Sequence, residues 1–172
     1  SIDTFLALVI AGLWEKEVRL LPYGEVNYDE IMRLAQEQAV VGLVAAGLEH
    51  VTDVKVPQVW ALQFVGQSIQ LEQRNNAMNW FVADVITKLR NADIYTLLVK
   101  GQGIAECYER PLWRSSGDVD LYLSKDNYKK AKLFLIPLAQ QIEKEDRRRL
   151  HLGLVIDGWT VELHGTLNTF IS

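Results

Sequence analysis

The chain has 172 residues, of which 49% are hydrophobic and 23% are charged, and its formal net charge is -4. This ordinary globular composition argues against disorder and fits one domain, or one compact domain with an added helical layer. An acidic chain has no general attraction for a phosphate backbone, so broad nucleic-acid binding would need a local basic patch.

The first half of the chain predicts helices. Apolar residues at helical spacing predict three of them, over residues 2–21, 27–50 and 57–91. Asn27 is a suitable N-cap for the second, and Pro57 suits the first turn of the third. His50 falls in the last turn of the second helix, where we expect it to meet the negative end of the helix rather than do chemistry. We therefore expect a helical region over residues 1–92.

The pattern changes at Ile94. The run Ile94–Val99 is apolar and β-prone, which predicts a central strand covered on both faces. Lys100-Gly101-Gln102-Gly103 and a short helix over residues 104–109 follow it. A strand, a glycine turn and a helix start can direct backbone N–H groups at a phosphate, although a tight turn needs glycine with or without a ligand. The spacing of a P-loop is absent.

The segment from Asp118 to Leu123 predicts a strand with one charged and one apolar face. Asp118 and Asp120 share the charged face. Neighbouring carboxylates repel each other unless one is protonated or a cation lies between them, and carboxylate oxygens suit Mg²⁺. The alternative is a solvated acidic edge. A helix capped by Ser124 or Asp126 follows, and it runs to about residue 135.

A β-hairpin is predicted near the end of the sequence. Asp157-Gly158 lies between two apolar segments, over residues 150–156 and 159–164, and this dipeptide favours a two-residue turn. The turn fixes the register. The predicted pairs are Ile156 with Trp159, Val155 with Thr160, Leu154 with Val161, Gly153 with Glu162, Leu152 with Leu163, and His151 with His164.

The polar face of this hairpin would carry Glu162. If that face is aligned with the charged face of the preceding strand, Glu162 joins the two aspartates, and Gly153 opposite leaves room for an ion or a phosphate. His151 and His164 are structural or contact phosphate, and metal ligation is less favoured because Mg²⁺ prefers oxygen. The basic run over residues 147–149 is interpreted as a solvated turn.

Four motifs occur in a characteristic order: Lys100-Gly101, Arg114, Gly117-Asp118-Val119-Asp120, and Val161-Glu162-Leu163-His164. Together they resemble the uncharacterised bacterial nucleotidyltransferases of the polymerase-beta-like nucleotidyltransferase superfamily, over most of the chain. The resemblance implies an α+β fold, with an N-terminal helical region (1–92) packed on a small mixed β-sheet nucleotidyltransferase core (93–172). Related enzymes place further contacts after the third carboxylate, so we expect this core to be truncated at its C-terminal end.

The resemblance also implies a chemistry. A nucleoside monophosphate would pass from a nucleoside triphosphate such as ATP to an acceptor hydroxyl, with release of pyrophosphate. Asp118 and Asp120 would hold two Mg²⁺ ions, for which Mn²⁺ can substitute, and Glu162 would complete the site of one of them. The nucleotide-binding residues would be Lys100, Gly101, Gln102, Arg114 and Ser116. Gln102 departs from the usual Gly or Ser, so a serine contact is missing or comes from Ser115 or Ser116.

Three functions stay open. The first is an enzyme that modifies a small molecule, a protein or a nucleic-acid end. The second is a catalytically silent nucleotide-binding or regulatory module. The third is a toxin-like transferase acting on tRNA, for which the acidic charge is unfavourable. Since Cys107 is the only cysteine, no internal disulfide can form. No apolar run is long enough for a bilayer, so we expect a cytoplasmic protein without a membrane partner.

Overall fold

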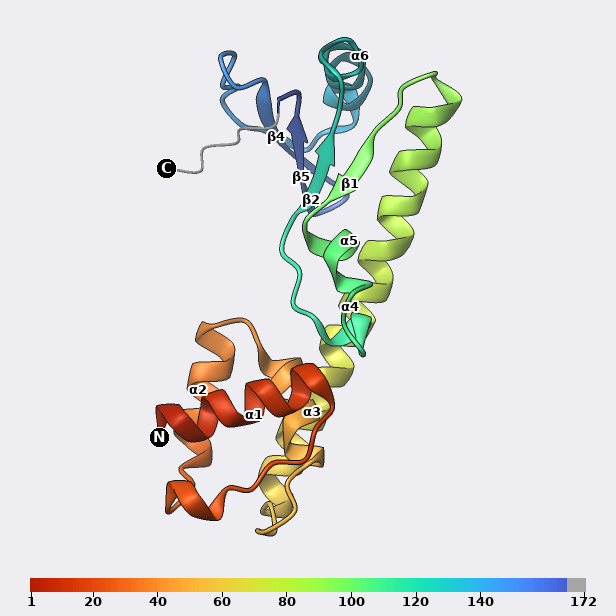
Figure 1. Cartoon of the computed structure of the whole chain (residues 1–172). Coiled ribbons are helices and arrows are strands. Elements are labelled where there is room, and N and C mark those ends of the chain that lie inside the picture. The colour runs from red at the N-terminus through yellow and green to blue at the C-terminus, as the bar shows by residue number, and fades with distance from the viewer. Residues whose placement is uncertain (167–172) are drawn as a thin grey trace. The chain divides into compact units, whose positions relative to one another are not determined.

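The computed structural model describes residues 1–166, with helices in the first half of the chain and a five-stranded mixed sheet in the second (Figure 1). This confirms the expected α+β class. The elements are α1 (Ile2–Trp14), η1 (Leu21–Tyr23), α2 (Tyr28–Glu37), α3 (Val41–Glu49), α4 (Gln58–Asn91), β1 (Leu97–Val99), α5 (Gly101–Ala105), η2 (Pro111–Trp113), β2 (Val119–Tyr122), α6 (Lys125–Leu135), η3 (Ile136–Leu138), β3 (Gln141–Ile142), β4 (His151–Ile156) and β5 (Trp159–His164).

The chain divides into two compact units that interleave in sequence. Unit 1 comprises Ser1–Asn76 and Ala105–Ser115, and unit 2 comprises Ala77–Ile104 and the chain from Ser116 onward. The two-domain division at residue 92 stays a prediction. None of the helices within residues 1–166 combines the length and the apolar character needed to cross a bilayer.

In unit 1, one predicted helix is shorter than expected and another is divided into two helices. Helix α1 ends at Trp14 rather than near residue 21, because Glu15 adopts a left-handed backbone conformation with φ 46°. The predicted helix over residues 27–50 is instead two helices, α2 and α3, separated at Ala39, which has φ 54°. Asn27 caps α2 as predicted, and its side chain accepts a hydrogen bond of 3.1 Å from the Glu30 N–H.

Helices α1 and α3 pack with their backbones in contact. A Cβ atom added at Gly12 would collide with the carbonyl of Leu43, and one added at Gly47 would collide with the carbonyl of Leu8. Only glycine permits the backbones of the two helices to lie this close together, so these two positions determine how α1 and α3 pack.

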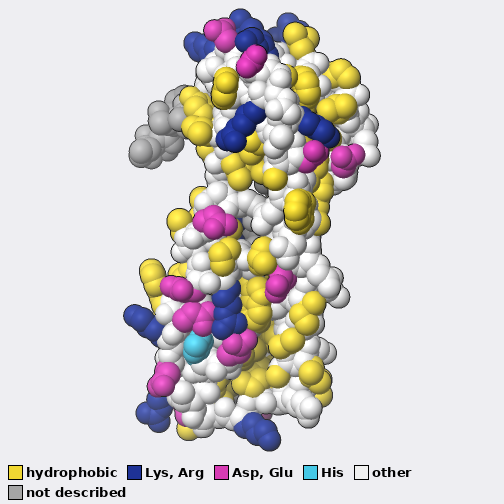
Figure 2. Space-filling view, turned by 90° about the vertical axis from the view of Figure 1, so that its right-hand side faces the viewer, with side chains coloured by type: hydrophobic (Ala, Val, Ile, Leu, Met, Phe, Trp, Pro, Cys, Tyr) yellow, Lys and Arg dark blue, Asp and Glu magenta, His cyan; other side chains and the backbone are white. Residues whose placement is uncertain are grey.

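An ion-pair network lies on the surface of unit 1. Arg110 donates to both oxygens of Glu15 (2.7 and 3.0 Å) and of Glu49 (3.0 and 2.8 Å), and its guanidinium lies 4.5 Å from the ring centroid of Trp113. His50 also contacts Glu15, at 2.5 Å. Figure 2 shows acidic side chains gathered around a basic side chain and a histidine in its lower part. His50 therefore has a structural partner in a carboxylate.

The sheet of unit 2 has the strand order β1-β2-β5-β4-β3. Strands β2 and β5 are parallel, and the other neighbours are antiparallel. The prediction of a central strand over residues 94–99 is wrong, because β1 covers only Leu97–Val99 and lies at the sheet edge with Leu97 64% exposed. The following helix, α5, begins at Gly101 rather than at residue 104.

The hairpin β4–β5 has the predicted register in all six pairs. Asp157 and Gly158 both have positive φ, 50° and 79°, as a type I′ turn requires. This turn aligns the apolar residues of both strands on one face of the sheet, so the polar residues of both strands share the other face.

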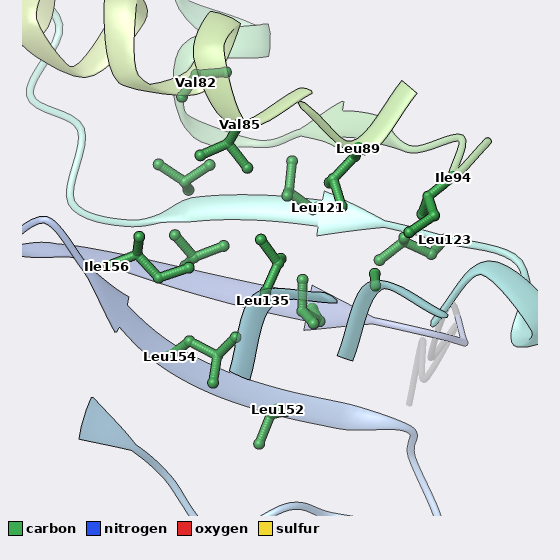
Figure 3. Packing of buried hydrophobic residues seen from close by; sticks show 14 of the residues in the cluster. Val82, Val85, Leu89, Ile94, Leu121, Leu123, Leu135, Leu152, Leu154 and Ile156 are labelled. Atoms are coloured by element: carbon green, nitrogen blue, oxygen red, sulfur yellow. The ribbon is translucent and has the colours of Figure 1, made fainter. Parts of the chain in front are cut away.

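The apolar face of the sheet packs against α4 and α6. Figure 3 shows Val82, Val85 and Leu89 of α4 on the same side of the sheet as Leu121 of β2. Fully buried members of this core include Leu89, Leu121, Leu123, Leu135, Leu152, Leu154, Val161 and Leu163. With one face covered by helices, the charged residues of β2, β4 and β5 lie on the opposite face, which is where the candidate site is found.

Candidate active site

The parallel pairing of β2 with β5 brings two of the predicted carboxylates together. Asp120 is the direct partner of Glu162, and Tyr122 is the partner of His164. Side chains of directly opposed residues lie on the same face of a sheet, so Asp120 and Glu162 are neighbours. Asp118 lies two residues before Asp120, is exposed, and comes immediately before β2.

Asp120 is the most buried of these carboxylates, with 6% of its surface exposed. Its Oδ1 accepts hydrogen bonds of 2.8 Å from Lys100 Nζ and pairs at 2.8 Å with His164 Nε2. Burial alone would raise the pKa of Asp120, but the bonds from Lys100 and His164 outweigh it and hold the pKa below its usual value. Asp120 is therefore an ionised carboxylate at neutral pH.

Lys100 is positioned by a strained turn after β1. Val99 is the strand partner of Asp120, and Lys100 follows it with φ 54°. Gly101 comes next with φ 27°, and a Cβ there would lie 3.2 Å from the Asp118 carbonyl. Glycine is needed at this position because the conformation and the close approach both disfavour a side chain. The hydrogen bond to Asp120 raises the pKa of Lys100.

The remaining predicted nucleotide contacts are distributed over both units. Gln102 and Ser116 belong to unit 2, and both are buried, at 9% and 4% exposure. Arg114 belongs to unit 1, where its guanidinium lies 5.7 Å from the ring centroid of Tyr108 and its carbonyl accepts a hydrogen bond from Asn75.

A cavity of about 370 Å³ opens beside Lys100 and the two histidines of the sheet. Arg149 lines it, although residues 147–149 were predicted to form a solvated turn. Arg147 fits that interpretation, since its side chain is 91% exposed. The sequence does carry a signal for Arg149: it lies two residues before His151, the first residue of β4, and therefore at the same end of the sheet as His151.

The histidine pair is more closely integrated into the site than the sequence suggested. His151 and His164 are strand partners whose ring centroids lie 4.9 Å apart. Their Nε2 atoms lie 3.5 and 3.3 Å from Glu162 Oε2. These three residues each offer one ligand atom, and the three atoms lie within 4.8 Å of one another.

The expectation that Gly153 leaves room for an ion is wrong. A Cβ added at Gly153 would collide with the carboxylate of Glu143, which covers this position opposite Glu162. Glu143 follows the short strand β3 and donates its backbone N–H to the Gly153 carbonyl at 2.9 Å. The position of Glu143 could not be predicted from the sequence, because no periodic pattern marks a two-residue strand.

A comparison with family models matches residues 24–169 to a family described as uncharacterised nucleotidyltransferase. The match includes β1, β2, β4 and β5 and every residue of the candidate site. Neither the curated proteins nor the solved structures yielded a match.

Proposed function

We propose, from the premise that this chain belongs to the uncharacterised nucleotidyltransferase family, that it transfers a nucleoside monophosphate from a nucleoside triphosphate to an acceptor hydroxyl and releases pyrophosphate. The observation that carries the proposal is the parallel pairing that sets Asp120 beside Glu162. We also propose a core of the polymerase-beta-like type. The acceptor would be a small molecule, a protein side chain or tRNA.

Asp118, Asp120 and Glu162 are the residues we propose to hold two Mg²⁺ ions, for which Mn²⁺ can substitute. Their oxygen donors fit hard divalent cations, which bind through a few carboxylates together with substrate phosphates. The lowered pKa of Asp120 supports this fit, because an ionised carboxylate is the form that binds metal. When bound, such ions would polarise the acceptor hydroxyl and offset the charge of the departing pyrophosphate.

The other residues of the site would orient the carboxylates and attract the triphosphate. Lys100 and His164 hold Asp120 from two sides, which fixes its rotamer within the sheet face. Lys100 and Arg149 also line the cavity, so both cations would draw a triphosphate toward the carboxylates. The resemblance to the nucleotidyltransferase family also supports nucleotide contacts at Gly101, Gln102, Arg114 and Ser116.

The test is nucleotide binding and pyrophosphate release, with ATP first and then each labelled nucleoside triphosphate in the presence of Mg²⁺. We expect Mg²⁺-dependent binding that the double change Asp118→Ala/Asp120→Ala abolishes. Mg²⁺-dependent nucleotide binding that survives the double change would contradict the proposed site. Binding without pyrophosphate release across a broad acceptor panel would instead favour a nucleotide-binding or regulatory module.

Arg149 provides a second test, with a matched control in the same loop. Arg149→Met should weaken nucleotide binding about fivefold to tenfold, as expected for the loss of one phosphate contact of about 1 kcal/mol. Arg147→Met removes the same charge from a side chain that is 91% exposed and does not line the cavity, so it should have little effect. Equal weakening by both changes would indicate general electrostatic attraction instead.

A further inference from the structure

We propose that His151, Glu162 and His164 bind a transition-metal ion of the Zn²⁺ class. This site shares Glu162 with the three-carboxylate site but has two imidazole nitrogens in place of the two aspartates. The observation is that the two imidazole Nε2 atoms and Glu162 Oε2 converge on one point of the sheet face. Two histidines and one glutamate are a donor set that proteins use for Zn²⁺.

The two distances from Glu162 to the histidines are close to what a tetrahedral ion requires, and all three donor atoms lie within 4.8 Å of one another. With bonds of about 2.0–2.1 Å to nitrogen and oxygen, two ligand atoms of a tetrahedral ion lie roughly 3.3–3.4 Å apart. Glu162 Oε2 lies 3.3 Å from His164 Nε2 and 3.5 Å from His151 Nε2. Small side-chain rotations would therefore bring the three donors to bonding distance of a common ion. His164 Nε2 would then exchange its 2.8 Å contact with Asp120 Oδ1 for the bond to the metal.

The backbone holds the ligands in this arrangement before any ion binds. His151 and His164 are opposed on β4 and β5, and Glu162 lies two residues before His164 on the same face of β5. The Asp157-Gly158 turn fixes this register, so little conformational entropy is lost on metal binding. The cavity of about 370 Å³ is lined by both histidines and supplies an entry path.

The donor chemistry separates this ion from Mg²⁺. Mg²⁺ takes oxygen ligands and keeps several waters, whereas imidazole nitrogen suits Zn²⁺ and its neighbours in the first transition row. The inference goes beyond the proposed function, because it requires neither a nucleotide nor Asp118. The two sites share Glu162, so the occupied Zn²⁺ site would remove this carboxylate from the Mg²⁺ set.

The experiment measures binding of the metal alone to the full chain. Zn²⁺ titrated calorimetrically into metal-free protein should bind at one equivalent, and Co²⁺ in its place should give the visible absorption of a tetrahedral ion. His151→Ala and His164→Ala should each weaken Zn²⁺ binding by about tenfold to a hundredfold. His50→Ala, which removes the remaining histidine of the chain, should leave it unchanged.

Proton NMR and an Asp118→Asn variant provide two further tests of the Zn²⁺ site. If a variant proves unfolded by circular dichroism, proton NMR of the wild-type chain replaces it, because Co²⁺ should shift the ring signals of His151 and His164 but not those of His50. Asp118→Asn should keep Zn²⁺ binding while losing Mg²⁺-dependent nucleotide binding, so failure of one proposal is distinguishable from failure of the other. Equal Zn²⁺ affinity in all three histidine variants, or Co²⁺ shifts confined to His50, would overturn the site.

Discussion

The ion pair between Lys100 and Asp120 provides a quantitative test of how the site is held. Lys100→Met keeps the approximate length of the side chain and removes its charge, while the contact of His164 with Asp120 Oδ1 remains. A hydrogen bond to a charged group contributes about 1.5–3 kcal/mol. The Lys100 side chain is 63% exposed, so solvent screening reduces this, and we expect a loss of about 1 kcal/mol in the free energy of unfolding at neutral pH.

The pH dependence of this loss follows from the pKa of Asp120. Because the folded-state pKa lies below the ordinary value of 3.8, the ionised carboxylate stabilises the fold above that value. This contribution is lost as the pH falls through the folded pKa. Removing Lys100 raises the pKa of Asp120, so the wild type should lose more stability on acidification than the variant does. The difference between the two proteins should therefore shrink as the pH falls below 3.8.

The assay is urea denaturation of both proteins across this pH range, with Lys88→Met as the control. Lys88 pairs with Asp84 at 2.7 Å, but both side chains are more than half exposed, so its removal should have the smaller effect. A Lys100→Met variant as stable as the wild type at neutral pH would refute the reasoning. A loss that persists undiminished in acid would refute it equally, because it would not depend on the ionised Asp120.

Three predictions concern stability elsewhere in the molecule. Gly47→Ala should destabilise unit 1 by about 1–3 kcal/mol in urea denaturation, whereas Gly66→Ala, at a helical position with open space around it, should stabilise by up to about 1 kcal/mol. Leu121→Ala should cost about 2–5 kcal/mol, and Leu133→Ala, at a side chain 75% exposed, should stay within about 0.5 kcal/mol of the wild type by the same assay. Arg110→Met should cost about 1–2 kcal/mol, measured as a lower urea midpoint, and the cost should decrease with added salt. Equal values within either matched pair, or a cost at Arg110 that salt does not change, would contradict the packing and charge assignments.

Features set by local chemistry could be predicted from the sequence. The Asp157-Gly158 turn gave the hairpin register correctly, and from it the position of Glu162 followed. Asn27 was identified as a helix cap, and the cap of α6 was narrowed to Ser124 or Asp126, of which Ser124 is the one found, because capping depends on a side chain and a backbone within three residues. The adjacency of Asp120 and Glu162 followed from aligning the polar faces of two strands.

Features set by distant parts of the chain could not be predicted. The break at Ala39 carries no glycine or proline signal: the exposed Ala39 adopts φ 54° where α2 ends, and the next residue, Val40, donates its N–H to the Ala35 carbonyl at 2.8 Å. The apolar composition of β1 suggested burial on both faces, yet an edge strand has one neighbour and leaves Leu97 exposed. Glu143 and Arg149 reach the site from the chain between β3 and β4, which has no periodic pattern.

The path of α4 determines how this protein can be divided for experiments. The helix passes from unit 1 into unit 2 at residue 77, and its second half supplies five side chains of the sheet's core: Met78, Phe81, Val82, Val85 and Leu89. A fragment beginning at residue 93 would lack all five and would expose the apolar face of its sheet to water. A fragment meant to carry the candidate site should therefore begin before residue 77 and retain the second half of α4.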